Sequence, residues 1–531
     1  MYYSINSKFR IEPTILLIGI LFVISCKENN NTIKNEAPFR EKYRPQVHFT
    51  PIEHWMNDPN GLVYLDGEYH LFYQHYPEKS VWGPMHWGHA ISKDLVYWEH
   101  MPIALYPDSL GYIFSGSAVY DKYNTSGLGT VENPPLIAFF TYHDMKAEKE
   151  ERYHEIETQS IAYSLDYGRN WTKYANNPVI KNPGLRDFRD PKVFWHEDTQ
   201  KWIMCIAAGQ EIQFYTSANC IDWQYSGEFG EGMGSHDGVW ECPDLFPLEV
   251  SGTDETKWVL IVSMNPGGPA GGSATQYFVG EFDGSKFSSE QERTLWMDYG
   301  KDNYAGVTWN NVPDKRRILI GWMNNWQYAG EKPTYKWSGA ATFPRELGLT
   351  NKSGHYLLTS IPVKEIENLY RNNSALTDIE VIHEKEIFEN ISFDKTPTEL
   401  LLTFNVRDNS RIDFPGRYGI HFKNETGESY TLGYDNVDKF FYIDRTNATS
   451  EVISDYFPSG QMIPYIINED QITWRIILDT SSVEFFTAEG LIVVTNVVYP
   501  TEPFDIIELF AENGIISLKK VEIRELKSIW K

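Results

Sequence analysis

The chain has 531 residues, of which 15% are aromatic, and a formal net charge of −26 at pH 7. It is too long for one hydrophobic core, so we expect two domains. An acidic surface repels phosphate backbones, which argues against nucleic acid as a partner and suits a neutral substrate.

Residues 1–25 are typical of a bacterial lipoprotein signal peptide. Lys8 and Arg10 precede the uncharged apolar run 14–25, which is shorter than the roughly 17–25 residues that span a bilayer. Ser25 before Cys26 resembles a lipobox and predicts lipidation of Cys26. The alternative is an ordinary cysteine behind a cleaved signal. We expect the protein at the cell surface or on the periplasmic side of the outer membrane, touching the membrane only through its lipid.

Residues 26–45 are rich in Asn, Lys and Glu and contain little to bury, which predicts a flexible tether. Beyond it, the remaining cysteines are Cys205, Cys220 and Cys242, and none has a metal-ligand spacing such as C-x-x-C. We therefore expect buried thiols with at most one disulfide, and no structural metal.

A repeat of acid, proline, strand, turn and strand follows. It begins at Asp58-Pro59, at Asp190-Pro191 and at Glu241-Cys242-Pro243. Two further hairpins, near residues 116 and 306, share the rhythm without the acid and proline. Five units of this size predict an all-β fold that begins with a five-bladed β-propeller, here placed at residues 46–360.

A second, fainter repeat falls after the return strands of three units. Its members are Ser92-x-Asp94, Ser164-x-Asp166 and Ser217-x-Asn219. Short polar side chains that bond to their own backbone stabilise turns, so we expect capped turns between outer strands.

Proline in the repeat indicates where the acids lie. It removes a ladder donor and is tolerated at the first residue of a strand or on an edge, and the innermost strand of a blade is such an edge. Asp58 and Asp190 should then stand at strand starts, and the three carboxylates of Asp58, Asp190 and Glu241 should converge on the central axis. Residues 361–371 read as a connector, and the alternating strands in 372–531 predict a C-terminal β-sandwich.

Six ordered blocks in the first domain resemble glycoside hydrolase family 32, which includes invertases, levanases and inulinases. The blocks are WMNDPNG (55–61), MHWGHAIS (85–92), FSGSAV (114–119), RDPKV (189–193), WECPDLF (240–246) and GWMNNWQYA (321–329) with WSGAATFPREL (337–347). The later LDTSSVEFF (478–486) resembles the sandwich domain of that family.

The resemblance implies a role for each acid: Asp58 as nucleophile, Glu241 as general acid and base, and Asp190 as a stabiliser that bonds hydroxyls of a fructosyl ring. It also implies a sugar pocket shaped by Asn57, Pro59, Asn60, Gln74, Trp82, Phe114, Ser115, Arg189 and Trp337. The neighbours of Glu241, Trp240 and Cys242, would favour its protonated form, whereas amide donors near Asp58 would favour its charge. No cofactor is needed.

These residues predict a retaining β-fructosidase that acts on levan, inulin or sucrose, with a fructan or fructo-oligosaccharide and chain-end attack preferred. The alternatives are a related five-bladed arabinosyl or xylosyl hydrolase and a lipid-anchored glycan-binding protein without turnover. Asp190 could instead form a structural ion pair with Arg189 or Arg186, and Trp82 and Trp337 could be packing residues. Linkage preference and oligomeric state stay open.

Overall fold

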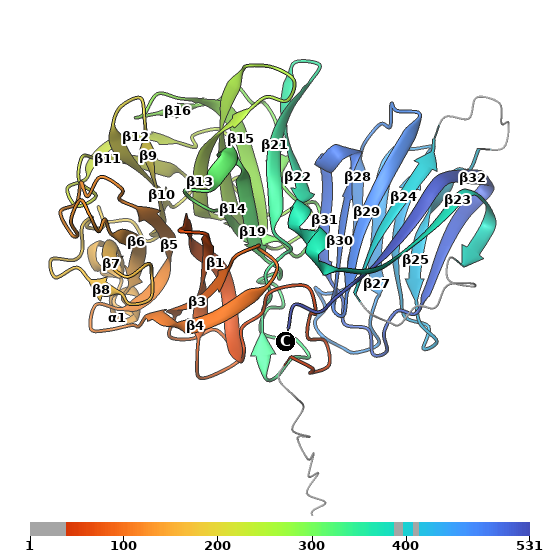
Figure 1. Ribbon diagram of the computed structural model, residues 1–531, viewed down its shortest axis with the longest axis horizontal. Coiled ribbons are helices and arrows are strands. Elements are labelled where there is room, and N and C mark those ends of the chain that lie inside the picture. Colours follow the sequence, from red (N-terminus) through yellow and green to blue (C-terminus); the bar gives the residue numbers. More distant parts are fainter. Residues whose placement is uncertain (1–38, 387–396, 407–413, 531) are drawn as a thin grey trace, which may run out of the picture.

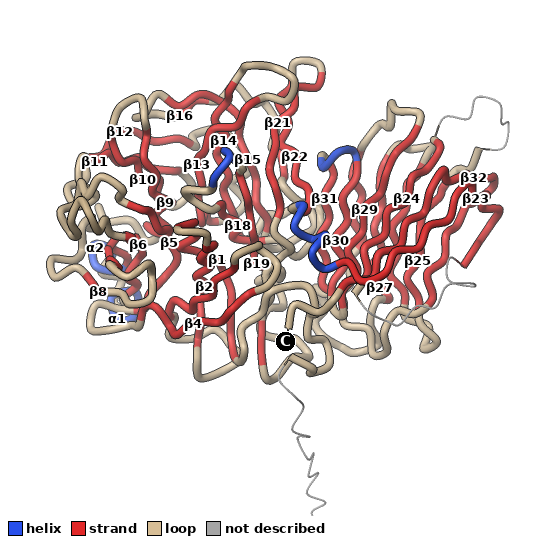
Figure 2. Tube along the Cα trace, in the orientation of Figure 1, coloured by secondary structure: helices blue, strands red, loops and turns tan. Residues whose placement is uncertain are grey.

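The computed structural model describes residues 39–386, 397–406 and 414–530. These residues form two β-domains that lie side by side, as Figure 1 shows, and strands dominate both (Figure 2). Their helices are short: α1 (Met145–Lys149), α2 (Tyr153–Ile156) and the 3-10 turns η1 (Pro313–Lys315), η2 (Lys364–Leu369) and η3 (Ala488–Gly490). None of the helices in the described part of the chain is long and apolar enough to cross a membrane. The predicted signal peptide and Cys26 lie outside these residues.

The first domain contains five antiparallel sheets, which are the blades of the predicted propeller. Blade one is β1 (His54–Leu65), β2 (Glu68–Tyr76), β3 (His86–Ser92) and β4 (Trp98–Leu105). Blade two is β5 (Tyr112–Tyr120), β6 (Leu136–His143), β7 (Glu157–Ser164) and β8 (Thr172–Lys173). Blade three is β9 (Phe188–His196), β10 (Lys201–Ala208), β11 (Ile212–Ser217) and β12 (Gln224–Phe229).

Blade four is β13 (Val239–Glu249), β14 (Thr256–Asn265), β15 (Ala274–Phe282), β16 (Phe287–Ser288) and β17 (Leu295–Trp296). Blade five is β18 (Tyr304–Thr308), β19 (Arg317–Trp322), β21 (Arg345–Lys352) and β22 (His355–Pro362). The first strands of the blades contact one another in a closed ring, from β1 through β5, β9, β13 and β18 back to β1. Strand β20 (Trp337–Ser338) follows β19 in the chain yet pairs in parallel with β1, which ties the last blade to the first. The propeller prediction is confirmed.

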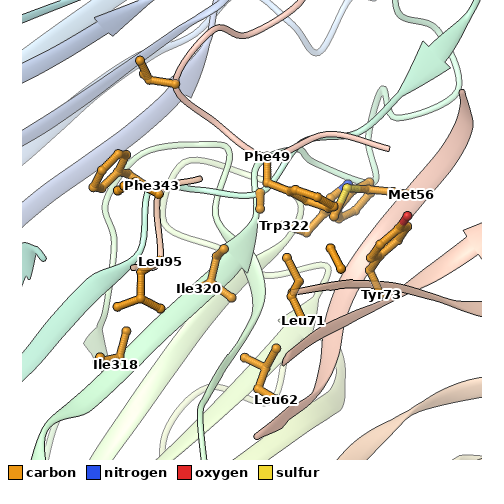
Figure 3. Packing of buried hydrophobic residues seen from close by; sticks show 14 of the residues in the cluster. Phe49, Met56, Leu62, Leu71, Tyr73, Leu95, Ile318, Ile320, Trp322 and Phe343 are labelled. Atoms are coloured by element: carbon orange, nitrogen blue, oxygen red, sulfur yellow. The ribbon is translucent and has the colours of Figure 1, made fainter. Parts of the chain in front are cut away.

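The core between the first and last blades is apolar and aromatic. Leu62, Leu71 and Tyr73 of blade one face Ile318, Ile320 and Trp322 of blade five, with Met56 and Phe49 beside them (Figure 3). Burying such side chains stabilises the ring closure by about 1.5–3 kcal/mol each relative to exposure.

The predicted capped turns are also confirmed. The backbone N–H of Asp94 donates to Ser92 Oγ at 3.2 Å, and Asp94 Oδ1 accepts from the N–H of Tyr97 at 2.9 Å, between β3 and β4. Equivalent bonds join Asp166 to Ser164 between β7 and β8, and Asn219 to Ser217 between β11 and β12. The repeat therefore marks the same turn in three successive blades.

The second domain is one sheet folded on itself, which confirms the predicted sandwich and adds how its halves are joined. Its strands are β23 (Tyr370–Glu386), β24 (Thr398–Asn405), β25 (Arg417–Lys423), β26 (Ser429–Asp435), β27 (Phe440–Asn447), β28 (Gly460–Pro464), β29 (Gln471–Asp479), β30 (Ser482–Thr487), β31 (Ile492–Val497) and β32 (Ile506–Leu526). The long β32 pairs with β25 in its first half and with β24 in its second, while β23 runs along both halves. The pairing of β23 with β32 shifts between Ile382 and His383, where residues 512–514 of β32 have no partner in β23, and such a bulge bends a sheet.

The described chain before residue 45 is packed, which differs from the expected tether. Arg44 is fully buried and donates from Nη1 to Thr50 Oγ1 at 2.8 Å and to the carbonyl of Pro51 at 2.7 Å. Phe39 stacks on Trp530 with ring centroids 4.0 Å apart. Composition alone concealed these contacts because the sequence around them is polar, whereas a few aromatic and arginine side chains fix the segment.

Candidate active site

The three predicted acids lie at β-bulges in the inner strands, whereas Asp58 and Asp190 were expected at strand starts. The pairing of β1 with β2 shifts between Met56 and Pro59, and that of β13 with β14 shifts between Glu241 and Asp244. In blade three the pairing of β9 with β10 shifts at Asp190, whose φ is +65°. Proline removes a ladder donor and a bulge re-aims the neighbouring side chain, so each acid leaves its own sheet and points to the axis.

Blades two and five carry bulges at the same level of the ring, without an acid. The pairing of β5 with β6 shifts between Ile113 and Gly116, and that of β18 with β19 shifts between Tyr304 and Val307. The first of these presents Phe114 and Ser115, and the second follows Tyr304. A β-bulge in the inner strand, repeated in all five blades, therefore positions the side chains of the site.

The acids open into one cavity of about 250 Å³, close to the lower end of small-molecule pockets. Its lining residues are Asn57, Asp58, Gln74, Trp82, Phe114, Ser115, His143, Glu148, Ile156, Glu157, Arg186, Asp187, Arg189, Asp190, Glu241 and Trp326. The cavity thus combines carboxylates, amides and aromatic rings, which is the composition that a sugar ring with hydroxyl edges and an apolar face requires.

Asp58 is held by donors from two blades. Asn57 Nδ2 donates to its Oδ1 at 2.9 Å, and Ser115 Oγ donates to its Oδ2 at 2.8 Å. Asn57 is itself oriented by Trp55, whose indole Nε1 donates to the amide oxygen at 2.7 Å. The buried tryptophan before the turn-like Asn-Asp-Pro-Asn-Gly run therefore positions the partner of the acid.

Cys242 links Asp58 to Asp190. Its backbone N–H donates to Asp190 Oδ2 at 2.9 Å, and its Sγ lies 3.5 Å from that oxygen and 3.7 Å from Asp58 Oδ2. All three described cysteines are buried and unbridged. Burial raises the pKa of the Cys242 thiol far above its usual range, so the group stays neutral between the two carboxyls.

Glu241 is bonded on both oxygens. Arg189 donates from Nη2 to Oε1 at 3.0 Å, and the Tyr304 hydroxyl donates to Oε2 in a short hydrogen bond. Arg189 is shared, because its Nη1 also contacts Glu157 at 3.2 Å and Asp187 at 2.7 Å. A single guanidinium therefore serves three carboxylates.

Burial raises the pKa of all three acids. Burial raises the pKa of Asp190 to about 7, with Arg189 opposing the shift and the charges of Glu241 and Asp58 adding to it. Burial also raises the pKa of Glu241, again against Arg189. For Asp58 the hydrogen bonds from Asn57 and Ser115 favour the charged form, as the sequence predicts for amide donors, but burial outweighs them and its pKa is raised too.

Six of the nine predicted pocket residues line the cavity: Asn57, Gln74, Trp82, Phe114, Ser115 and Arg189. Gln74 is buried, and its Nε2 has no partner among the described residues, so it faces the cavity as a free donor. Asp190 forms no ion pair with Arg186, which also lines the cavity.

Pro59, Asn60 and Trp337 do not line the cavity. Asn60 is buried, and its Nδ2 donates to the carbonyl of Asp58 at 3.3 Å. Pro59 is a buried ladder residue opposite Tyr73. Trp337 packs in the core with the Arg44 guanidinium 4.6 Å from its ring centroid, so it is a packing residue.

The prediction missed several lining residues, chiefly Glu157, His143 and Trp326. Trp326 lies in the family-like block at 321–329 and could have been found there, whereas Glu157 and His143 pair across the ends of β7 and β6. His143 Nδ1 lies 3.1 Å from Glu157 Oε1, and its ring stacks on Phe114 with centroids 4.3 Å apart. Within the described residues no group of three His, Cys, Asp or Glu side chains could hold a metal ion.

The propeller presents carboxylates that converge on its axis, and a β-sandwich follows it in the chain. This combination defines a class of glycoside hydrolases. Comparison with known families agrees: the profile of the Glycosyl hydrolases family 32 N-terminal domain matches residues 48–360, and that of the C-terminal domain matches residues 365–525. The chain belongs to glycosyl hydrolases family 32.

Among characterised relatives, the chain is 46% identical to a levanase of Bacillus subtilis over 93% of this chain and 72% of that protein. It is 37% identical to an extracellular exo-inulinase of Aspergillus niger over 93% of this chain and 96% of that protein. Among solved structures, the β-fructofuranosidase of Schwanniomyces occidentalis complexed with fructosyl-erythritol superimposes with a TM-score of 0.83 and 31% identity, over 93% of this chain and 99% of that one.

Proposed function

We propose that the protein is a retaining fructan hydrolase of the levanase and exo-inulinase type, which removes fructose units from chain ends. The observation that carries this proposal is the convergence of Asp58, Asp190 and Glu241 from three blades on one cavity. The identity to the levanase and to the exo-inulinase supports the substrate class. Sucrose is a further candidate substrate.

In the first step, Asp58 attacks the anomeric carbon of a terminal fructosyl unit while Glu241 gives its proton to the departing glycosidic oxygen. The bond from carbon to oxygen breaks and an ester bond to Asp58 forms. Retaining enzymes hold the two carboxyls about 5–5.5 Å apart. Glu241 can supply this proton because burial raises its pKa and favours the neutral acid.

In the second step, Glu241 takes a proton from water, whose oxygen attacks the anomeric carbon and releases Asp58 as a carboxylate. Arg189 stabilises Glu241 once it has become charged, because its guanidinium lies 3.0 Å from Oε1. The hydrogen bonds from Asn57 and Ser115 stabilise the departing Asp58 in the same way. Each charge that forms thus finds a donor already in place.

Asp190 is proposed to bind sugar hydroxyls. Its Oδ2 accepts from the backbone of Cys242, which leaves Oδ1 for the substrate. Gln74 offers an amide donor, and Trp82, 39% exposed, stands at the rim with its ring 6.3 Å from that of Phe114. A cavity of about 250 Å³ suits one sugar unit, which supports chain-end attack.

For location, we propose an extracytoplasmic enzyme anchored through lipidated Cys26. The Aspergillus niger relative is extracellular, which supports work outside the cytoplasm. The lipid itself is supported by the lipobox-like sequence Val23-Ile24-Ser25-Cys26. Labelling with a radioactive fatty acid in the parent and in Cys26→Ala tests it: label in the parent alone is expected, and an unlabelled parent would refute the anchor.

Product analysis tests the activity. Levan, inulin, sucrose and arabinan are incubated separately with the protein, and early products are separated by chromatography. We expect fructose as the first product from levan or inulin, with no oligosaccharide ladder. Arabinose release without fructose would favour the related arabinosyl hydrolases, and binding without any product would favour a glycan-binding protein.

A further inference from the structure

A second, larger cavity lies at the opposite end of the propeller axis from the acids. Its volume is about 480 Å³, against about 250 Å³ for the catalytic cavity. It is lined by the ends of the inner strands, by the turns that follow them and by the starts of the return strands, including Tyr120, Tyr123, Trp195, Trp258, Asn311 and Arg317. Along β5, β9 and β13 these ends are four to six residues beyond Ser115, Asp190 and Glu241, which corresponds to roughly 15 Å.

The two cavities are separate, because polar groups close the channel between them. Asn310 Nδ2 bridges two inner strands by donating to the carbonyls of Ala118 and Val193 at 2.8 and 3.0 Å. Lys192 of β9 and Asp244 of β13 form a buried ion pair of 2.9 Å between two neighbouring inner strands. No residue lines both cavities, so the second one is no extension of the catalytic cavity.

Aromatic rings form the wall of the second cavity. Tyr123 is 56% exposed, and its ring centroid lies 6.1 Å from that of Trp195. On the other side the Trp258 ring lies 5.7 Å from Phe194. A concave aromatic wall with access to solvent is the surface on which the apolar faces of sugar rings pack.

Arg317 adds a set of donors to this wall. Its Nε is buried without a partner among the described residues, and its Nη1 has one long hydrogen bond, 3.3 Å to Thr308 Oγ1. A guanidinium carries five N–H donors in a fixed plane, so most of its capacity is unused. Buried donors are normally satisfied, which indicates a ligand with several oxygen acceptors.

The charges around the cavity indicate a neutral ligand. Lys122 forms an ion pair of 3.6 Å with Glu197 at the rim. Asp198 offsets the charge of Arg317 among the lining residues, which leaves the lining without net charge when His196 is neutral. Glu197 and Asp198 are neighbours on one exposed turn and do not face each other across the cavity, so they cannot act as a hydrolytic pair.

From this geometry we propose that the second cavity is a non-catalytic binding site for a neutral saccharide. Sugar rings pack on Tyr123, Trp195 and Trp258, and vicinal hydroxyls accept from Arg317. A polymer held there stays near the enzyme between cleavage events, which raises its local concentration at the catalytic cavity. The site does not depend on the reaction proposed above, since it shares no residue with the catalytic cavity.

Titration calorimetry on the Glu241→Gln variant of the full chain tests the proposal, because this variant leaves the ligand intact. The probes are fructo-oligosaccharides of the inulin and levan types and a cello-oligosaccharide. We expect two binding events per chain with at least one fructo-oligosaccharide, and a single event if the cello-oligosaccharide binds. Binding of the cello-oligosaccharide alone to the second cavity would support the site and identify its source as a glucan.

Variants assign the second event to the cavity. Tyr123→Ala removes an exposed ring, and Arg317→Lys keeps the charge but removes the planar set of donors; each should abolish the second event in the Glu241→Gln background. Tyr225→Ala is the matched control, because Tyr225 is 53% exposed on the outer strand β12 of blade three. It should retain both events.

Fold and catalysis are checked in the active enzyme, where Tyr123→Ala should cleave a trisaccharide at the parent rate. If Tyr123→Ala misfolds, Arg317→Lys decides alone. The proposal is overturned if every fructo-oligosaccharide gives one binding event, the cello-oligosaccharide gives none, and both cavity variants give the same isotherms. This holds even if fructan hydrolysis is confirmed.

Discussion

Two buried charge clusters of this protein contain the same residue types and have opposite electrostatics. At the boundary between the domains, Arg345 contacts Asp298 at 2.9 Å and Glu484 at 3.4 Å, and His48 contacts Asp479 at 2.7 Å. Burial acts to raise the pKa of Asp479, but the hydrogen bond and charge of His48 lower it below its usual value. The pKa of Glu484 is likewise lowered despite burial, chiefly by Arg345.

For Asp58, Asp190 and Glu241 in the catalytic cavity the balance is reversed, because Arg189 is shared among Glu241, Glu157 and Asp187, while Asp58 and Asp190 accept no hydrogen bond from an arginine. The pKa values of Asp58, Asp190 and Glu241 are raised. Burial is common to both clusters, so the number of cations decides whether a buried carboxyl is an inert anchor or a group that can exchange a proton.

The largest expected effect is the loss of activity on removing either reacting acid. Asp58→Asn and Glu241→Gln should each lower kcat by about 10⁴-fold or more, as for other residues that form or break bonds. Neither change should destabilise the fold, because each removes one of several mutually repelling acids. Initial rates on levan and thermal unfolding of both variants measure this. A variant with activity within tenfold of the parent would contradict the catalytic role assigned to that residue.

The domain boundary should show the opposite result, a loss of stability with little loss of activity per folded molecule. Arg345→Met leaves Asp298 and Glu484 buried without their partner, which costs about 3–5 kcal/mol. Urea unfolding measures it. Lys315→Met is the control, since Lys315 and Glu249 are exposed and their loss should leave the midpoint unchanged. Equal midpoints for Arg345→Met and the parent would contradict the contrast.

A smaller effect is expected from Arg189→Lys, which keeps the charge but loses the bonds to three carboxylates. We expect kcat to fall by about 10–100-fold. Arg189 opposes the burial that raises the pKa of Glu241, so weakening it should raise that pKa further. The alkaline limb of the pH profile, where Glu241 loses its proton, should move to higher pH. A limb that stays in place, with kcat reduced, would show that Arg189 does not tune Glu241.

The smallest effects concern stability against pH. His48 has an ordinary pKa of 6.5 that Asp479 and Glu484 raise to about 9 against burial. Its stabilising charge is fully present below pH 6.5 and is lost as pH rises to about 9. His48→Gln should therefore flatten the fall in the free energy of unfolding over that window.

Asp190 acts in a lower window. Its pKa is raised from 3.8 to about 7, so the folded state binds the proton more tightly and stability falls as pH rises between these values. Asp190→Asn should be more stable than the parent above pH 7, while being less active. Urea midpoints from pH 4 to 9 test both variants. Parallel curves for parent and variants would contradict the assigned shifts.

The sequence was sufficient for the blades and for the acids because proline marks both. A proline after Asp58 and after Asp190 cannot donate to a ladder, so the repeated acid and proline locate the bulge of an inner strand. The same argument placed these acids at strand starts, which is wrong by a few residues, since β1 begins at His54 and continues through the bulge.

The other residues of the site could not be predicted, because this requires the pairing register of the strands, which the sequence does not reveal. Glu157 and His143 face each other only when β6 and β7 are paired, and neither carries a local signal. Trp337 was expected in the pocket because it lies in a matched block, yet burial against Arg44 makes it a packing residue. The sharing of Arg189 among Glu241, Glu157 and Asp187 is likewise visible only in three dimensions.

The central claim is that Asp58 forms the covalent bond while Glu241 moves the proton. Acid quenching of the enzyme during turnover of a fructo-oligosaccharide, followed by peptide mass spectrometry, tests it most directly. The account predicts one fructosyl group on the peptide that contains Asp58, and none on that peptide in Asp58→Asn. A fructosyl group on Glu241 or Asp190 instead, or an initial product of inverted configuration, would contradict it.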